Sequence, residues 1–187
     1  MFGLALRAFV LCLGTPALCA EVAGITLADK VSVGGQALVL NGAGISTKMF
    51  FKIYVGSLYL PQKAGDVRGV LARGPRRIQM NFLRDLSVNQ LVGGLVGGLN
   101  ANNTPAELAT VRVPTDELLD IMKRFQDVEM REGDVLTLDF IDGATTFALN
   151  GETAGVVSGE AFNKALTQIW LGNKPAHPAL KKAMLGG

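Results

Sequence analysis

The sequence predicts a single α+β domain in which an antiparallel sheet is covered on one face by a helical layer. The first observation is a run of three alternating segments, Val135–Ile141, Thr145–Leu149 and Thr153–Val157. They are joined by Asp142-Gly143 and Asn150-Gly151, residue pairs typical of tight hairpin turns, so they predict an antiparallel meander. The second observation is that amphipathic helical segments are grouped apart from the strands, which favours helices on one face of a sheet.

The first 20 residues are predicted to be a secretory signal peptide that is not part of the fold. Arg7 supplies a positive charge, the apolar run Ala8–Leu13 follows, and small residues precede a cleavage point after Ala20. Cleavage after Cys19 is the alternative, and a lipid anchor on Cys19 is disfavoured because the preceding residues fit a lipoprotein signal poorly. No second apolar run approaches the about 20 residues that span a bilayer. We therefore expect a periplasmic or secreted domain, residues 21–187, that is not transmembrane after cleavage.

Composition argues against several classes of function. The 18 basic and 16 acidic residues nearly balance, which gives no electrostatic case for nucleic acid, since that requires a clustered basic face. Both cysteines, Cys12 and Cys19, lie in the leader. With one histidine and no remaining thiol, a tetrahedral zinc site lacks ligands, and no metal site is predicted. The histidine, His177, is predicted to be a solvated loop residue, with haem or metal ligation as the alternative.

The segment Leu40–Pro61 is the most informative stretch of the chain. It is predicted to open with a glycine turn at residues 41–44, because glycine takes positive φ values without steric cost. A long strand, Met49–Leu60, is predicted to follow. One of its faces carries Met49, Phe51, Ile53 and Val55, and the other carries Phe50, Lys52 and Tyr54. Large apolar groups on both faces indicate a strand covered on both sides, by the core and by a helix or a ligand.

A second distinctive segment is a glycine-rich helix predicted to begin at Ser87. Ser87 and Gln90 have the spacing of a capping box, and four glycines follow in the helix interior. Each interior glycine costs about 1 kcal/mol relative to alanine, so another interaction must offset the loss. The glycines fall on one strip of the helix, which leaves room either for close helix–sheet packing or for a ligand.

The remaining elements follow from periodicity and capping signals. Strands are predicted at 22–25, Lys30–Val33, Ala37–Leu40 and Arg77–Leu83, with a Gly34-Gly35 turn before the third and a short helix at Ala64–Ala72. Further helices are predicted at the caps Thr104, Thr115 and Ser158, and a last short helix at Pro178–Leu185.

Five motifs in order resemble the bacterial chalcone isomerase-like proteins of the chalcone isomerase family. They are N-G-A-G-I at Asn41–Ile45, Y-V-G-S-L-Y-L at Tyr54–Leu60, N-F-L-R-D-L-S at Asn81–Ser87, N-G at Asn150-Gly151 and I-W-L-G at Ile169–Gly172. The resemblance covers the chain from Glu21 to Gly187. It implies an antiparallel sheet with a helical layer and a ligand cleft between them, in agreement with the elements predicted above.

The resemblance also implies where catalytic residues would lie, and this chain departs from the family there. The arginine on which the family's ring-closing chemistry depends falls on Ser46. The family tyrosine falls on Leu91, the asparagine near Gly98, and the strand threonine on Ile53 or Tyr54. Such an arginine can contribute several kcal/mol of transition-state stabilisation, which serine cannot replace. We therefore expect no catalytic residues and a non-catalytic binder; the alternative is an intramolecular lyase with a rebuilt active site.

The expected ligand is a small apolar molecule of the fatty-acid type, because other branches of the family bind fatty acids without catalysis. Its cleft is predicted between the Met49–Leu60 strand and the glycine-rich helix, with Lys52, Tyr54 and Arg84 available to a carboxylate. Alternatively, Lys52 reaches solvent and Arg84 pairs with Asp85. The candidate cleft residues are Ser46, Lys52, Ile53, Tyr54, Arg84, Leu91, Gly94 and Gly98.

Other interpretations stay open at this point. No cofactor is predicted, although haem also has an apolar body with acidic tails. A structural module with a filled core and no cavity is a third class of function. The sequence does not determine the oligomeric state.

Overall fold

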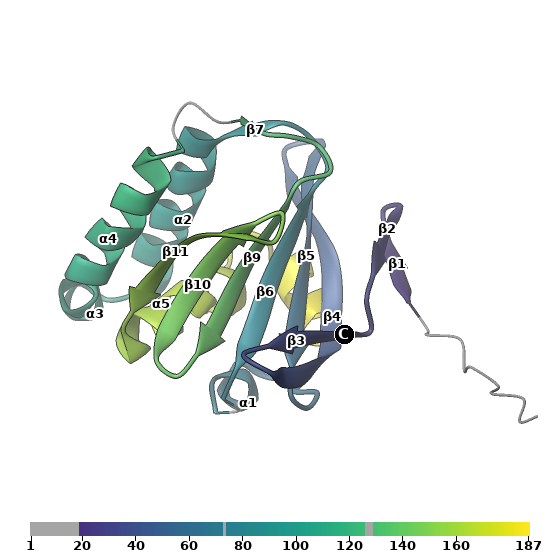
Figure 1. Cartoon of the computed structure of the whole chain (residues 1–187), viewed down its shortest axis with the longest axis horizontal. Coiled ribbons are helices and arrows are strands. Elements are labelled where there is room, and N and C mark those ends of the chain that lie inside the picture. The colour runs from purple at the N-terminus through teal and green to yellow at the C-terminus, as the bar shows by residue number, and fades with distance from the viewer. Residues whose placement is uncertain (1–18, 73, 126–128) are drawn as a thin grey trace, which may run out of the picture.

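In the computed structural model, which describes residues 19–72, 74–125 and 129–187, the chain folds around a seven-stranded antiparallel sheet (Figure 1). The strand order across the sheet is β11-β10-β9-β6-β5-β4-β3. The strands are β3 Lys30–Val33, β4 Gln36–Lys48, β5 Phe51–Leu60, β6 Arg76–Phe82, β9 Val135–Ile141, β10 Ala144–Leu149 and β11 Glu152–Ser158. The predicted α+β class and its antiparallel sheet are confirmed.

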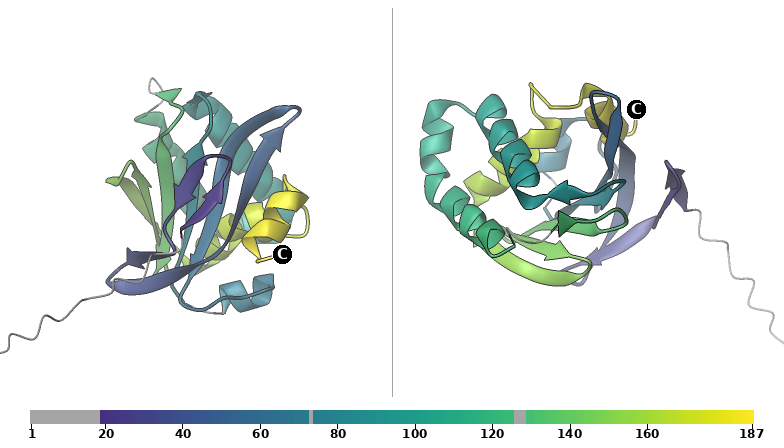
Figure 2. Two further views of the ribbon diagram at one scale, coloured as in Figure 1. Left: turned by 90° about the vertical axis from the view of Figure 1, so that its right-hand side faces the viewer. Right: turned by 90° about the horizontal axis from the view of Figure 1, so that it is seen from above.

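Helices cover one face of the sheet, which curls around them when the molecule is seen from above (Figure 2, right). α2 packs against α5, α4 packs against β11, and α6 packs against β4. The helices are α1 Val67–Leu71, α2 Val88–Asn102, α3 Pro105–Thr110, α4 Arg112–Lys123, α5 Glu160–Leu171 and α6 Pro178–Met184. In the part of the chain that the structure describes, no helix has the length and apolar character needed to cross a bilayer.

The core lies between the sheet and the helices. Ile78, Met80 and Phe82 of β6 are fully buried on one face of the strand, as their alternation predicts. Phe162 and Leu166 of α5 are buried against them in the same apolar cluster. Burying a large apolar side chain contributes about 1.5–3 kcal/mol before conformational entropy is subtracted. These side chains therefore join β6 and α5 in one apolar core.

Arg76 is a charged side chain within this core. It is 4% exposed and lies with its guanidinium carbon 4.4 Å from the centre of the Phe140 ring. Its Nε donates to the Thr167 hydroxyl at 3.0 Å, and its Nη2 donates to the Asn163 carbonyl at 3.1 Å. Burial lowers the pKa of Arg76 to about 10, so the group is still charged at neutral pH. The interaction joins β6 to α5.

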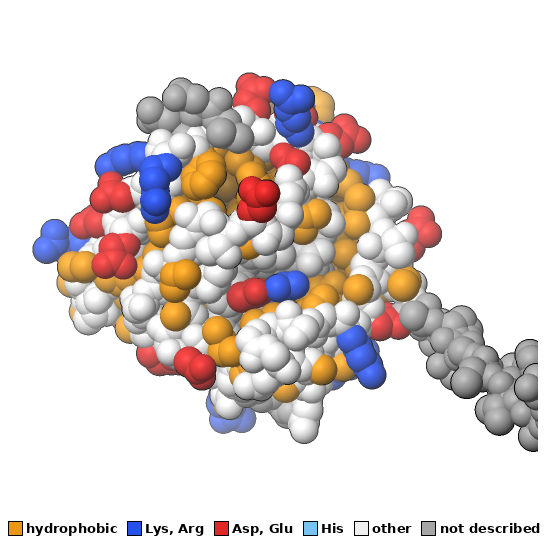
Figure 3. All heavy atoms as spheres, viewed as in Figure 1, with side chains coloured by type: hydrophobic (Ala, Val, Ile, Leu, Met, Phe, Trp, Pro, Cys, Tyr) orange, Lys and Arg blue, Asp and Glu red, His pale blue; other side chains and the backbone are white. Residues whose placement is uncertain are grey.

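Charged side chains elsewhere are mixed in sign. The side of the molecule in Figure 3 carries Lys, Arg, Asp and Glu side chains interspersed with apolar ones. Arg77 and Asp139, on the neighbouring strands β6 and β9, form a bidentate pair with both N–O distances at 2.6 Å.

The two tight hairpins of the C-terminal meander are confirmed. Asp142 and Gly143 have φ values of +48° and +74°, and Asn150 and Gly151 have +51° and +85°. Two consecutive positive φ values match the right-handed twist of the flanking strands, and Asn-Gly or Asp-Gly adopts them with little strain. Across these turns β10 pairs with β9 in one continuous register and with β11 in a register that shifts once, between Phe147 and Ala148.

The predicted glycine turn at residues 41–44 is wrong. β4 continues through this segment to Lys48, with a shift in its pairing with β5 at Asn41, and the chain reverses at Met49-Phe50 instead. The glycines serve close packing against α6. A Cβ on Gly42 would collide with the Ala183 carbonyl oxygen, and one on Gly44 would lie 2.7 Å from the Ala183 Cβ. Glycine inside a strand often marks such an approach of another backbone.

Asn41 fixes this approach with three hydrogen bonds. Its Nδ2 donates to the Met184 carbonyl at 2.7 Å and to the Ala64 carbonyl at 3.0 Å. Its Oδ1 accepts from the Ala64 backbone N–H at 2.7 Å. The side chain therefore ties the middle of β4 to the C-terminal end of α6 and to the chain after β5.

Helix starts were predicted with mixed success. The capping boxes at Ser87 and Thr104 are present in full. Thr115 is not a cap, because α4 already begins at Arg112, directly after α3, and the Thr115 hydroxyl donates to the Val111 carbonyl at 2.7 Å. Ser158 ends β11, and Gly159 occupies the cap position of α5 with a φ of +140°.

Two small two-stranded sheets complete the fold. β1 (Ala20–Val22) pairs with β2 (Ile25–Leu27), and β7 (Leu86–Ser87) pairs with β8 (Glu129–Met130). The single strand predicted at 22–25 is wrong, since Ala23 and Gly24 form the turn between β1 and β2 with positive φ values. Residues 1–18 of the predicted leader lie outside the described part of the chain.

The close approach of α6 predicts opposite effects for two glycine substitutions. Gly42→Ala forces a Cβ into the α6 backbone, and we expect a loss of about 1–3 kcal/mol in the free energy of unfolding. Gly97→Ala in α2 meets nothing within 4 Å, and we expect a gain of about 1 kcal/mol. Urea unfolding followed by circular dichroism measures both, and equal effects would contradict the packing described here.

Candidate functional site

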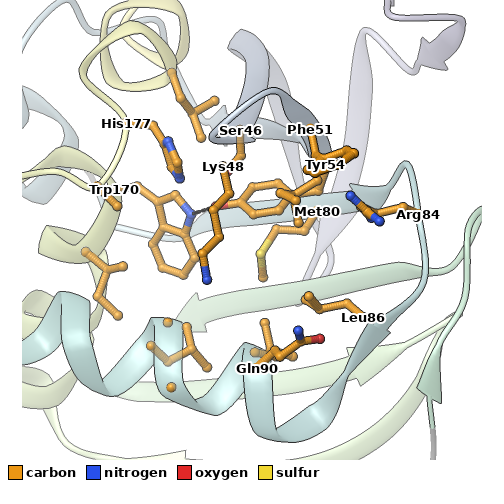
Figure 4. Close-up of a pocket in the computed structure, with 18 of the residues that line it drawn as sticks. Ser46, Lys48, Phe51, Tyr54, Met80, Arg84, Leu86, Gln90, Trp170 and His177 are labelled. Carbon is orange, nitrogen blue, oxygen red and sulfur yellow. Dashed lines mark hydrogen bonds between the residues drawn. The ribbon is translucent and has the colours of Figure 1, made fainter.

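A cavity of about 770 Å³ lies between the free end of the β4–β5 hairpin and helices α2, α5 and α6. Figure 4 shows side chains from all of these elements converging on it. Its volume falls within the range of about 300–1,000 Å³ typical of small-molecule pockets. The apolar lining includes Phe51, Ile53, Met80, Leu91, Leu95 and Ile169.

An uncharged hydrogen-bonded cluster forms one wall. The Trp170 indole N–H donates to the Tyr54 hydroxyl at 3.0 Å, and the Ser46 hydroxyl hydrogen-bonds to the same group. Burial raises the pKa of Tyr54, and these two hydrogen bonds oppose the shift only in part. Tyr54 is therefore a neutral phenol at neutral pH. Its ring also packs edge-on against Phe82, with the ring centres 6.2 Å apart.

A bulge in β5 decides which of its side chains face the cavity. Ser46 pairs with Tyr54 and Thr47 pairs with Lys52, so Ile53 is an extra residue opposite β4. A bulge disrupts the strict alternation of faces and re-aims the side chains beside it. Ile53 and Tyr54, although consecutive, both line the cavity, whereas Lys52 is exposed and outside it.

Two cations border the cavity. Lys48, at the end of β4, is exposed and lines it, and Arg84 lines it from the β6–β7 connection. The Arg84 guanidinium lies over the Phe51 ring, 4.4 Å from its centre (Figure 4). Within the described residues neither cation has a carboxylate within salt-bridge distance. Asp85 also lines the cavity, but its Oδ1 accepts from the Glu132 backbone N–H at 2.9 Å.

His177 is part of the cavity wall, next to the start of α6. It lies in the loop before α6, as predicted, but is partly buried rather than solvated. Desolvation lowers the pKa of His177, so the ring is neutral at neutral pH. No group of three His, Cys, Asp or Glu residues that would bind a metal ion occurs in the described ranges.

The glycines of α2 have two different surroundings. Gly93 and Gly94 line the cavity, and a Cβ added to either would have no atom within 4 Å, so the missing side chains widen the cavity. Gly98 instead packs on α5, where a Cβ would lie 2.6 Å from the Ile169 Cγ2. Both explanations for the glycine strip, room beside the helix and close packing, hold at different positions.

The structure brings most of the predicted cleft residues together. Six line the cavity: Ser46, Ile53, Tyr54, Arg84, Leu91 and Gly94. Lys52 and Gly98 do not, for the reasons given above. Sequence reasoning missed Lys48, His177 and Trp170 as cavity residues. Trp170 entered the sequence analysis only as part of the I-W-L-G motif, and no sequence signal placed the chain before α6 beside β4.

The fold and the cavity together define an α+β domain with an apolar cavity between a curled sheet and its helices. A family model described as chalcone isomerase-like matches residues 19–186. The chain belongs to the chalcone isomerase-like family.

A solved structure and the curated proteins give two further comparisons. The crystal structure of a fatty-acid binding protein from Arabidopsis thaliana aligns with a TM-score of 0.60 and 15% sequence identity, covering 87% of this chain and 92% of that one. At this identity the likeness shows the fold. No curated protein matches the sequence significantly.

The position that matches the family arginine, Ser46, belongs to the hydrogen-bonded cluster that forms one wall of the cavity. Ser46 is 1% exposed, and its hydroxyl is engaged with Tyr54. The wall therefore offers neutral hydrogen-bonding groups and no fixed charge at this point. A developing oxyanion here would lack the electrostatic stabilisation that a guanidinium provides. The charges lie elsewhere, at Lys48 and Arg84.

Proposed function

We propose that this protein binds an elongated apolar molecule with a carboxylate head group, of the fatty-acid class, without catalysing a reaction on it. The observation that carries the proposal is an apolar cavity of about 770 Å³ bordered by two cations, Lys48 and Arg84, that have no carboxylate partner among the described residues. The solved structure of similar fold is that of a fatty-acid binding protein, which supports this ligand class.

The energetic terms suit such a ligand. Apolar surface removed from water contributes about 25 cal/mol per Å², from which the ordering of the ligand is subtracted. Lys48 and Arg84 provide charge-assisted hydrogen bonds that fix the orientation of the head group. Arg84 is already held over Phe51, so less of its conformational entropy is lost on binding.

The first prediction from this proposed function concerns head-group recognition. We expect the double variant Lys48→Gln, Arg84→Gln to bind palmitate about tenfold more weakly, since each charge-assisted contact is worth about 1.5–3 kcal/mol when dry and less near solvent. Binding of the uncharged alcohol, hexadecanol, should be unchanged. Trp170 is the single tryptophan and lines the cavity, so its fluorescence reports binding.

Lys52→Gln is the matched control, because Lys52 is an exposed lysine on the same hairpin outside the cavity. It should leave palmitate affinity unchanged. Equal palmitate affinity of the wild-type protein and the double variant would contradict the assignment of the head-group site. A Soret absorption band in protein purified from its own host would favour haem instead, for which His177 is the one imidazole among the residues that line the cavity.

The second prediction concerns catalysis. We expect no acceleration of chalcone cyclisation above the spontaneous rate, because the positions matched to the family's catalytic set hold Ser46, Leu91 and Gly98. Absorbance of the chalcone measures the reaction. A rate above background that is lost in Ser46→Ala or Tyr54→Phe would support the intramolecular lyase with a rebuilt active site.

The third prediction concerns location. We propose that residues 1–20 are a signal peptide and that the mature protein is periplasmic or secreted, on the basis of the charged, apolar and small-residue regions of the leader. N-terminal sequencing of protein from its own host should begin at Glu21, or at Ala20 if cleavage follows Cys19. A cytoplasmic protein that keeps Met1 would exclude this proposal.

A further inference from the structure

The turn between β4 and β5 carries an exposed apolar cluster, here called the hairpin tip and consisting of Met49, Phe50 and Phe51. Their exposed fractions are 84%, 95% and 57%. The other large apolar side chains that are exposed in the described part of the chain are Val113 and Val156, each isolated on another element. Phe51 and Met49 also line the cavity, whereas Phe50 does not.

The residues of this turn are unusual for its geometry. Met49 has a φ of +56°, a left-handed conformation that favours glycine, asparagine or aspartate. The four other two-residue hairpin turns among the described residues, at 23–24, 34–35, 142–143 and 150–151, all have glycine with a positive φ at the second position. At the hairpin tip the chain has Met-Phe instead. The apolar side chains are therefore present despite the conformational preference, and turn formation does not account for them.

Positive charges surround the hairpin tip. Lys48 and Lys52 flank it in the sequence and are exposed, and the Arg84 guanidinium lies over the Phe51 ring. Asp85 also lines the cavity, and one of its carboxylate oxygens accepts from the Glu132 backbone N–H. Apolar side chains with a basic border complement an anionic lipid surface, where aromatic rings enter the interface and Lys and Arg meet the head groups.

The hairpin tip is placed for such a contact. It forms the free end of the β4–β5 hairpin, at the upper right of the left view in Figure 2. Met49 and Phe51 of the hairpin tip line the cavity, as does the neighbouring Lys48. An acyl chain leaving a bilayer beside Phe50 would reach the cavity along apolar side chains without crossing water.

We propose that the hairpin tip docks on anionic lipid bilayers by inserting Phe50 and its neighbours into the interface. Lipid docking does not depend on the proposed function. The further idea that docking lets a fatty acid pass from the bilayer into the cavity does rest on the proposed function. A second copy of this chain is the competing occupant. The three basic residues around the tip disfavour it, because a symmetric tip-to-tip contact would bring like charges together.

The test measures vesicle binding by flotation of the purified protein, without fatty acid, on phosphatidylglycerol and phosphatidylcholine vesicles. We expect stronger binding to phosphatidylglycerol, weakened by salt. Phe50→Ser should reduce the partition coefficient by about tenfold or more, because it removes the apolar surface of one aromatic side chain that would be buried in the interface. Lys52→Gln should reduce it by about fivefold on phosphatidylglycerol alone. Val113→Ser, an exposed apolar residue on α4, is the control and should bind as the wild type does.

Measuring palmitate affinity in solution, without vesicles, tests the proposed function separately from lipid docking. Phe50→Ser and Lys52→Gln should both leave it unchanged, since neither residue lines the cavity. Met49→Asn is a second variant that suits the left-handed turn while removing an apolar side chain, so it tests docking even if Phe50→Ser is unstable. Vesicle binding by Phe50→Ser and Met49→Asn equal to that of the wild type would overturn the proposal. A dimer that Phe50→Ser dissociates would assign the hairpin tip to self-association instead.

Discussion

The close contact of α6 with the middle of β4 is the constraint on which the cavity depends. Gly42 and Gly44 allow the α6 backbone to lie against the strand, and Asn41 fixes the contact by donating to the Met184 carbonyl. Packed this closely, α6 covers the sheet at one place, and His177, just before it, forms part of the cavity wall. The cavity occupies the space that remains between this contact, α2 and the free end of the hairpin.

The polar groups around the cavity divide into a neutral wall and a charged border. Ser46, Tyr54 and Trp170 bond mainly to one another, so they are largely satisfied and place no charge in the interior. Lys48 and Arg84 lie at the end of the hairpin, nearer solvent, where a charge retains part of its hydration. This division suits a ligand with an apolar body and one anionic end, because burying an unpaired charge deep in an apolar cavity is costly.

The β4–β5 hairpin has two distinct parts. At its base, β4 and β5 are paired within the sheet, and a bulge at Ile53 turns two consecutive side chains toward the cavity. Its end exposes Met49 and Phe50 to solvent. The same hairpin thus supplies part of the binding wall and the most exposed apolar surface among the described residues.

The sequence by itself determined the α+β class, the C-terminal meander and the capping boxes at Ser87 and Thr104. Each of these rests on local rules, since Asp-Gly and Asn-Gly adopt positive φ and a capping box joins residues three apart. The tertiary structure alone decided that Gly42 and Gly44 serve packing, because the α6 backbone they meet is about 140 residues away in the chain. It also decided that Lys48 rather than Lys52 borders the cavity. One extra residue in β5 changes which side chains face inward, and the residue types in this segment do not reveal the bulge.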